Sequence, residues 1–223
     1  MLLIYGFVAP PLPVDDLTGV DGAPVEVVGS APVAAVVSRH VEVPPTTEEH
    51  ALAHARVVAA LGERAPSLPG RYGIVLPDEP AVAAVLANAT ESLQTALARV
   101  GTAVEFAVRG RERVAVPPSP PRDGSGRAYL EARLAGERAR EVAIAERHAA
   151  IAAASEPLRA FATEELWVEG PLGPEHCLLI RRDDVAAFRS AAASLDDDPV
   201  VRVTGPWPPY TFASVTLPHV ESA

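Results

Sequence analysis

The sequence predicts an α+β protein of two domains. After residue 101 the apolar patterns follow the order strand, long alanine-rich helix, strand, strand, short helix, strand. This order is typical of ferredoxin-like (βαββαβ) domains, in which two helices pack on one face of an antiparallel sheet. Before that point, three or four short strand patterns and two helical patterns form a separate mixed unit. We therefore expect an N-terminal α+β domain over residues 1–101 and a ferredoxin-like C-terminal domain over residues 102–223.

The N-terminal domain is expected to open with three strands. Residues 2–8 form an apolar run that is too short for a helix and is closed by prolines, which indicates a buried strand. Residues 25–28 and 33–37 are β-type runs joined by Gly-Ser-Ala-Pro, which suits a hairpin. A further strand is expected to end at Pro77. Arg71 lies beside glycines that lack a phosphate-loop pattern, so we expect a structural ion pair there.

A first helix is predicted from Thr46 to about Arg64. Thr46 as N-cap and Glu49 three residues later form a capping box, which satisfies free N–H groups at the helix start. The buried face is expected to hold Ala51, Ala55, Val58 and Leu61. His50 and His54 are four residues apart, a spacing that can ligate a metal ion, but nothing nearby completes a site. We expect a half-exposed structural pair and no metal.

A second helix has the clearest amphipathic pattern of the chain. Asp78 is its expected N-cap, and Pro80 lies in the first turn, where a missing N–H costs nothing. The expected buried stripe is Val82, Val85, Leu86, Ala89, Leu93, Ala96, Leu97 and Val100. Gly101 is expected to end the helix.

The C-terminal domain is expected to begin with a strand over residues 104–108, in which Glu105 and Ala107 alternate with apolar residues. A proline- and glycine-rich loop over residues 117–126 follows. The later strands are expected at 165–169 and 177–180.

The longest helix is predicted from Arg127 to about Ser155. It carries a seam of mostly small residues at alternating spacings of four and three: Ala128, Ala132, Ala135, Ala139, Val142, Ala149 and Ala153. Such a seam lets another backbone approach closely, within the chain or between chains, and homo-oligomerisation is therefore possible. The ion pairs Arg133–Glu137 and Glu137–Arg140 are expected on the solvated face.

A short helix and a last strand complete the predicted domain. Asp183 and Asp184 are expected to cap the helix. Its expected buried stripe is Val185, Phe188, Ala192 and Leu195. The strand from Val200 is expected to stop at Gly205-Pro206, because proline offers no N–H to a sheet.

Three aromatic residues follow this strand in the string Gly-Pro-Trp-Pro-Pro-Tyr-Thr-Phe. Prolines hold such a segment stiff and extended. One interpretation is a lid that folds back over a core edge. The other is a partner-docking surface, since rigid aromatic side chains bind at a low entropic cost. The candidate partner-binding residues are Trp207, Pro208, Pro209, Tyr210 and Phe212.

Composition excludes several classes of function. The net charge of −10 argues against nucleic acid and against anionic membrane surfaces as partners. No apolar run approaches the roughly 20 residues of a membrane span, and the N-terminus lacks the basic start of a signal peptide, so a cytoplasmic protein is expected. The single cysteine, Cys177, is expected to be a buried apolar residue. No nucleophile motif, phosphate loop or metal cluster is present, so we expect neither catalysis nor a cofactor.

Several collinear motifs resemble the gas vesicle protein F/L (GvpF/GvpL) family. The N-terminal blocks are His54-Ala-Arg-Val-Val and Leu-Pro-Gly-Arg71-Tyr72-Gly73, the second written with Phe in most of the family. The later matches are Glu105, Gly-Arg127-Ala-Tyr129-Leu with Arg133, Phe188, and the string from Gly205 to Phe212. The matched residues outside that final string are expected to be structural.

This resemblance implies a two-domain α+β accessory protein of gas vesicle assembly. Its expected partners are the major hydrophobic shell protein and other gas vesicle accessory proteins, and its expected location is the vesicle shell. An acidic partner that stays soluble could cover the apolar surface of such a subunit before assembly. A second hypothesis is a small-molecule-sensing regulatory module, because ferredoxin-like domains often bind ligands.

Overall fold

The computed structural model describes residues 1–113 and 126–213 and divides the chain into two compact units. Unit 1 comprises Met1–Glu105 and the chain from Pro206 onward, whereas unit 2 comprises Phe106–Gly205. The expected C-terminal domain, residues 102–223, therefore differs from unit 2 at both ends. The proline-rich segment 117–121 lies outside the described residues.

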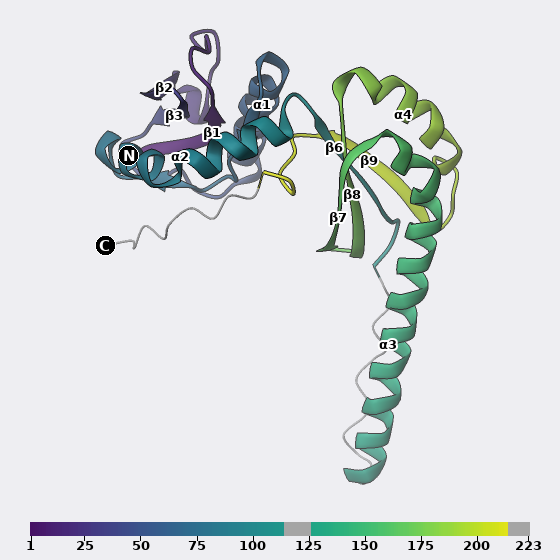
Figure 1. Cartoon of the computed structure of the whole chain (residues 1–223). Helices are drawn as coiled ribbons and strands as arrows, with labels where there is room; N and C mark the ends of the chain where they lie inside the picture. The colour runs from purple at the N-terminus through teal and green to yellow at the C-terminus, as the bar shows by residue number, and fades with distance from the viewer. Residues whose placement is uncertain (114–125, 214–223) are drawn as a thin grey trace. The chain divides into compact units, whose positions relative to one another are not determined.

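Unit 1 is built on a five-stranded sheet (Figure 1). Its strands are β1 (Leu2–Val8), β2 (Val25–Ser30), β3 (Val33–Arg39), β4 (Ser67–Pro69) and β5 (Val75–Leu76). The order is β2-β3-β1-β4, with β5 also paired to β1, and all of these pairs are antiparallel. Every residue of β1 is buried, which explains its continuous apolar sequence. Gly6 is required there, because a Cβ atom would lie 2.4 Å from the Leu68 carbonyl oxygen of β4.

Helix α1 (Glu48–Arg64) begins one residue later than the capping prediction requires. The N-cap is Thr47, whose Oγ1 accepts a hydrogen bond from the His50 N–H at 3.3 Å, so the proposed Thr46 cap is wrong. The buried face is Ala53, His54, Val57, Val58 and Leu61. The expected burial of Ala51 and Ala55 is also wrong, because Ala51 is half-buried and Ala55 is exposed. The face of α1 that packs on the sheet is the one that contains His54.

Helix α2 (Glu79–Val100) follows its prediction closely. Asp78 Oδ1 accepts a hydrogen bond from the Ala81 N–H at 2.9 Å, and Pro80 lies in the first turn. The buried residues are the eight predicted ones: Val82, Val85, Leu86, Ala89, Leu93, Ala96, Leu97 and Val100. Gly101, at φ 55°, ends the helix in a left-handed conformation that favours glycine.

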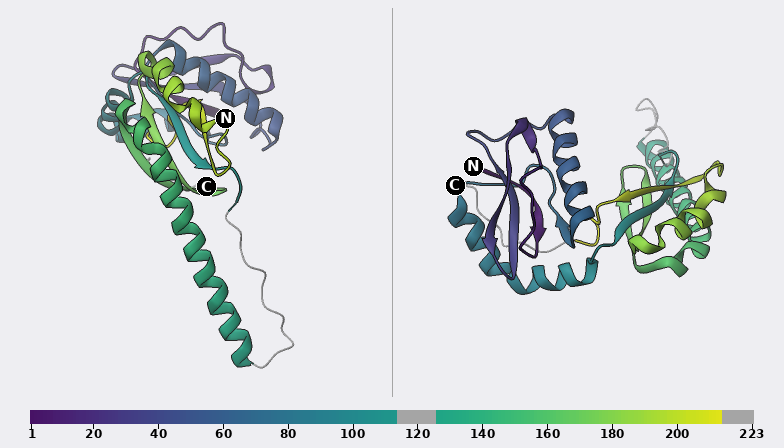
Figure 2. Two further views of the ribbon diagram at one scale, coloured as in Figure 1. Left: turned by 90° about the vertical axis from the view of Figure 1, so that its right-hand side faces the viewer. Right: turned by 90° about the horizontal axis from the view of Figure 1, so that it is seen from above.

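Unit 2 contains the helices α3 (Gly126–Ser155) and α4 (Val185–Ala192) and a four-stranded sheet (Figure 2). The strands are β6 (Val104–Gly110), β7 (Ala162–Gly170), β8 (Gly173–Ile180) and β9 (Val201–Trp207). Strand β6 begins in unit 1, and β9 ends there. The strand order is β7-β8-β6-β9. The first and third strands of the motif are therefore central, which is the ferredoxin-like arrangement predicted from the element order. Phe106 of β6 and Phe188 of α4 pack with ring centroids 4.4 Å apart, so α4 packs against the sheet through this contact.

Two predictions for the strands of the C-terminal half are corrected. The alternation expected for β6 fails, since Glu105 and Ala107 are as buried as their neighbours. Strand β9 continues through Gly205-Pro206 to Trp207, which an edge strand allows because a proline there interrupts no central ladder.

The expected caps of α4 also fail, because no side chain caps its start and Asp183-Asp184 lies in a preceding 3₁₀ turn. Asp198 acts instead at the following strand, where its Oδ1 accepts from the Val200 and Val201 N–H groups. Those two bonds lower the pKa of Asp198. Of the predicted stripe, Phe188 and Ala192 are buried, and Val185 and Leu195 are half-buried.

The C-terminal part of α3 holds the helix to the sheet. Ile151 and Ser155 are its buried residues. Trp167 of β7 lies between two imidazole rings, His148 of α3 at 3.8 Å and His176 of β8 at 4.5 Å between centroids. Burial lowers the pKa of His176, so its ring packs in the neutral form.

On α3 the predicted seam packs against no described element, and the two predicted ion pairs do not form among the described residues. All seven seam residues are exposed, so the seam is not used within the described chain. In the described residues neither Arg133–Glu137 nor Glu137–Arg140 forms, whereas Arg127 and Glu131 pair at 2.8 Å. No described helix combines the length and the apolarity needed to cross a membrane.

Candidate partner-binding surface

The C-terminal arm, residues 206–213, folds onto unit 1 as a compact turn. The Tyr210 N–H donates to the Pro208 carbonyl at 2.7 Å, and the Ala213 N–H donates to the Pro209 carbonyl at 2.9 Å. Phe212 is fully buried and Pro209 is buried. Tyr210 packs against the core cluster of unit 1 that includes Tyr5, Val57 and Leu61.

A buried carboxylate fixes this arm. Glu105 is 7% exposed, and its Oε1 accepts from the Thr211 hydroxyl at 2.7 Å while its Oε2 accepts from the Thr211 N–H at 2.9 Å. The Arg99 guanidinium donates to the Phe212 carbonyl. The two bonds from Thr211 satisfy the Glu105 carboxylate, which would be costly to bury alone. The sequence marked Glu105 as a motif residue but gave no sign of this partner, which follows it by more than 100 residues.

The two interpretations of the arm apply to different residues. Pro209, Tyr210 and Phe212 form a lid over the core of unit 1. Trp207 is 52% exposed at the end of β9, and Pro208 is half-buried beside it. Within the arm, Pro206 and Trp207 are therefore the exposed residues, and Trp207 is the exposed aromatic side chain.

His54 is a structural residue of the unit 1 core. Its Nε2–H donates to the Ile4 carbonyl at 3.0 Å, since a carbonyl can only accept. The ring stacks on Tyr5 at 4.9 Å and meets the edge of Tyr72 at 5.4 Å. Burial lowers the pKa of His54, which keeps the ring neutral. The half-exposed histidine pair expected from the sequence is corrected here, because His54 is 1% exposed.

His50 faces a different set of groups from His54. Its Nε2 lies 2.8 Å from Asp21 Oδ1, and its Nδ1 lies 3.0 Å from the Pro45 carbonyl. The Pro45 carbonyl and the Asp21 carboxylate raise the pKa of His50. Over residues 1–113 and 126–213, no three His, Cys, Asp or Glu side chains are grouped to hold a metal ion.

The second N-terminal motif shapes a turn. The Tyr72 hydroxyl donates to the Pro45 carbonyl at 2.8 Å, and Gly73 has a φ of 94° that favours glycine. Arg71 is exposed, and no ion pair with it forms among the described residues. The remaining motif residues lie in the N-terminal half of α3, where Arg127 and Arg133 are exposed and Tyr129 is half-buried.

Sequence reasoning missed a hollow in unit 1 of about 550 Å³. Its lining is Met1, Leu2, Arg39, His40, Val41, Pro77, Asp78, Glu79 and Pro80. Val41 is 97% exposed at this hollow, and Arg39 pairs with Glu26 and Glu79. The sequence feature that could have indicated this hollow is Val41, a valine between polar residues just after β3. An isolated exposed valine is common on protein surfaces, so the feature alone predicts no hollow.

Comparison with known proteins identifies the family. The family described as gas vesicle synthesis protein GvpL/GvpF matches residues 1–214. The chain belongs to the GvpL/GvpF family. This membership gives it a role connected with gas vesicles.

Two crystal structures of GvpF proteins share the fold. GvpF from Anabaena sp. PCC7120 matches with a TM-score of 0.76 and 18% identity, over 99% of each chain. GvpF from Microcystis aeruginosa matches with a TM-score of 0.75 and 20% identity, over 96% of this chain and 99% of the other. No curated protein sequence matches this chain.

Proposed function

We propose that this GvpL/GvpF family protein is a non-enzymatic accessory protein that binds the hydrophobic gas vesicle shell protein and supports vesicle nucleation or assembly. The family match over residues 1–214 supports the connection with gas vesicles. The observation that carries the binding proposal is Trp207, a large aromatic side chain that is 52% exposed on an arm held by hydrogen bonds to the buried Glu105.

The geometry of the arm suits a docking role. Tyr210 and Phe212 anchor the segment in unit 1, and Glu105 holds it between them. Trp207 is therefore presented with little freedom to lose on binding, which favours affinity. Tryptophan is also among the residues most often found to dominate binding energy at interfaces.

Charge and apolar surface agree with an apolar partner. The net charge of −10 keeps the protein soluble while it covers an apolar subunit. The hollow beside Val41 adds exposed apolar surface to unit 1. Association at the vesicle shell follows from this proposal.

The test is co-purification with the co-expressed major gas vesicle shell protein. Trp207→Ala is expected to weaken capture by about 2 kcal/mol, which is roughly 30-fold, without lowering the melting temperature. Trp167→Ala is the matched control, because Trp167 is 39% exposed but lies within unit 2, stacked between two histidines. Its capture should stay at the wild-type level.

Absence of capture by the folded wild-type protein would refute shell-protein binding. If capture fails and an amino acid or nucleotide instead raises the melting temperature, the small-molecule-sensing function takes its place. If both tryptophan variants capture normally, the binding surface lies elsewhere than on the arm.

A further inference from the structure

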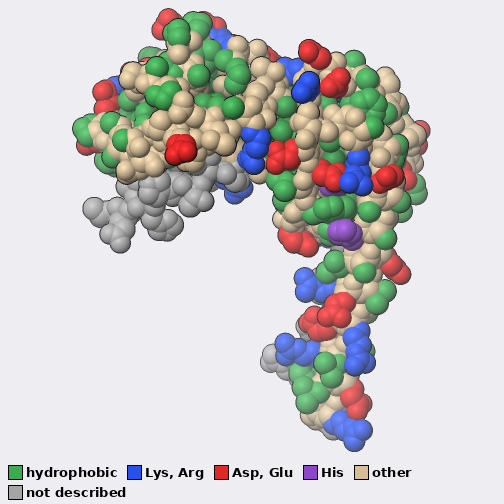
Figure 3. Space-filling model, in the orientation of Figure 1, with side chains coloured by type: hydrophobic (Ala, Val, Ile, Leu, Met, Phe, Trp, Pro, Cys, Tyr) green, Lys and Arg blue, Asp and Glu red, His purple; other side chains and the backbone are tan. Residues whose placement is uncertain are grey.

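The N-terminal half of α3, residues 126–142, extends beyond the sheet of unit 2, and no other described element packs against it (Figure 1). None of its described side chains is buried, and Leu130, Leu134 and Val142 are more than half exposed. Apolar and charged side chains lie together on the surface of this half of the helix (Figure 3). Most of the stability of helices in proteins comes from tertiary packing of one face. The segment spans about 25 Å at 1.5 Å per residue, which is long enough for a helix–helix contact.

One face of this segment is apolar and suited to close approach. It is formed by Ala128, Ala132, Ala135, Ala139 and Val142, at alternating spacings of four and three. At about 100° per residue, this face lies on the far side of the helix from Ile151, which is buried against the rest of unit 2. Among the described residues, packing of α3 within unit 2 therefore leaves the apolar face uncovered.

The charges beside this face identify what can bind it. Glu131 and Arg138 are seven residues apart, so they lie on the same flank of the apolar face. They lie on opposite sides of Ala135 along the helix. When two copies run antiparallel with Ala135 at their twofold axis, Glu131 of each copy comes opposite Arg138 of the other.

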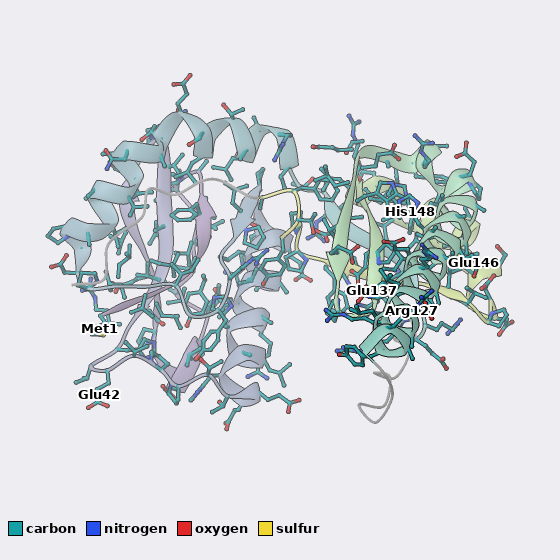
Figure 4. All side chains as sticks on the ribbon, turned by 90° about the horizontal axis from the view of Figure 1, so that it is seen from below. Met1, Glu42, Arg127, Glu137, Glu146 and His148 are labelled. Carbon is teal, nitrogen blue, oxygen red and sulfur yellow. The ribbon has the colours of Figure 1, made fainter. Side chains whose placement is uncertain are left out.

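We propose that residues 126–142 of α3 bind the same segment of a second copy of this chain in an antiparallel helix pair. In a parallel pair, this flank would face Tyr129, Gly136 and Ala143, which offer no charge. The next seam position after Val142 is Glu146, which ends the apolar face and limits the pair to the N-terminal half of α3 (Figure 4).

The pairing is expected to be weak and concentration-dependent. Two alanine faces of this length bury little area, whereas stable interfaces bury more than about 1,000 Å². The two Glu131–Arg138 contacts are exposed to solvent, so rising salt should weaken the dimer. Glu131 remains available for them, because it is 64% exposed even while it pairs with Arg127.

Sedimentation velocity of the full chain at rising concentration tests the proposal. The wild type should shift from monomer to dimer, and Ala135→Glu, which places two carboxylates at the axis, should remain a monomer. Leu130→Glu adds the same charge on the far side of α3, at a residue that is 58% exposed, and should dimerise normally. Circular dichroism of each variant checks that the helix is kept.

Charge exchange supplies a test that a loss of folding cannot imitate. Glu131→Arg and Arg138→Glu should each weaken the dimer at least tenfold, because each places like charges opposite one another. The double variant restores opposite charges and should return the dissociation constant to near the wild-type value. Failure of the double variant to recover would overturn the charge register.

Cysteine cross-linking fixes the orientation. Ala135→Cys should form a disulfide between copies, since an antiparallel axis brings residue 135 against itself. Ala128→Cys should not, because the two copies of residue 128 lie at opposite ends of the pair. The natural Cys177 is buried at 2% exposure and contributes no background. A chain that stays monomeric up to its solubility limit, or equal cross-linking at both positions, would overturn the proposal.

Discussion

His54 shows at the scale of one residue how a polar side chain becomes part of a core. Its Nε2–H donates to the Ile4 carbonyl, and its ring packs between Tyr5 and Tyr72. In the neutral form the Nε2–H is satisfied by this hydrogen bond. The sequence offered only the spacing to His50, which pointed to a pair, and the structure separates the two by giving each its own partners.

The burial of His54 predicts acid sensitivity. Its pKa is lower in the folded chain than the ordinary value of about 6.5, so below that pH the unfolded chain binds more protons. The free energy of unfolding should therefore fall as the pH drops below about 6.5. His54→Gln is expected to reduce this pH dependence while costing about 1–2 kcal/mol at pH 7 through lost packing. Urea denaturation at pH 5 and pH 7 measures both effects.

His50 supplies the control with the opposite sign. Its pKa is raised in the folded chain, so its stabilisation is present at acid pH and is lost as the pH rises through the folded pKa. His50→Gln should therefore lose stability mainly at acid pH. An unchanged pH dependence in His54→Gln would show that His54 is not the group responsible.

At the scale of the element, helix starts divide the predictions that succeeded from those that failed. Asp78 was predicted correctly because Pro80 fixes the position of the helix start in the sequence. At α1 two threonines compete, and the capping-box pattern selected Thr46, whereas Thr47 makes the bond. A local pattern could not decide between them, since the choice depends on where α1 must begin for His54 to face Tyr5.

The two threonines make a matched pair of substitutions. Thr47→Ala should destabilise the protein by about 1 kcal/mol, because it removes the hydroxyl that accepts from the His50 N–H. Thr46→Ala should change stability by less than about 0.5 kcal/mol, as expected for a surface position without a specific bond. Thermal unfolding of both variants at pH 7 tests this, and equal effects would contradict the assignment of the cap.

Secondary elements with one buried face were the most predictable. All eight residues of the α2 stripe were found from spacing alone, since that helix buries one face and exposes the rest. Strand β6 was read as half-exposed because Glu105 looked like a solvated residue, and only the distant Thr211 explains its burial. The alanine seam of α3 was visible in the sequence, but whether it packs within the chain is decided by the position of the sheet.

At the scale of the whole molecule, the chain leaves unit 1 after Glu105 and returns to it at Pro206. The sequence order of elements indicated a simple division near residue 101, because a returning segment carries no local signal of its destination. The candidate site depends on this return. Of its five aromatic and proline residues, only Trp207 is more than half exposed, and that depends on contacts of the arm with unit 1.

The return of the chain predicts that the arm stabilises unit 1. Phe212 is fully buried, so Phe212→Ala should destabilise by about 3–5 kcal/mol through lost burial and a cavity. Hydrogen exchange should speed up in β1, α1 and α2, which belong to unit 1, before it does in the β7–β8 hairpin of unit 2. Trp207→Ala is the comparison, and its exchange should remain at the wild-type level because the indole is half exposed. Faster exchange confined to the β7–β8 hairpin in Phe212→Ala would contradict the assignment of the arm to unit 1.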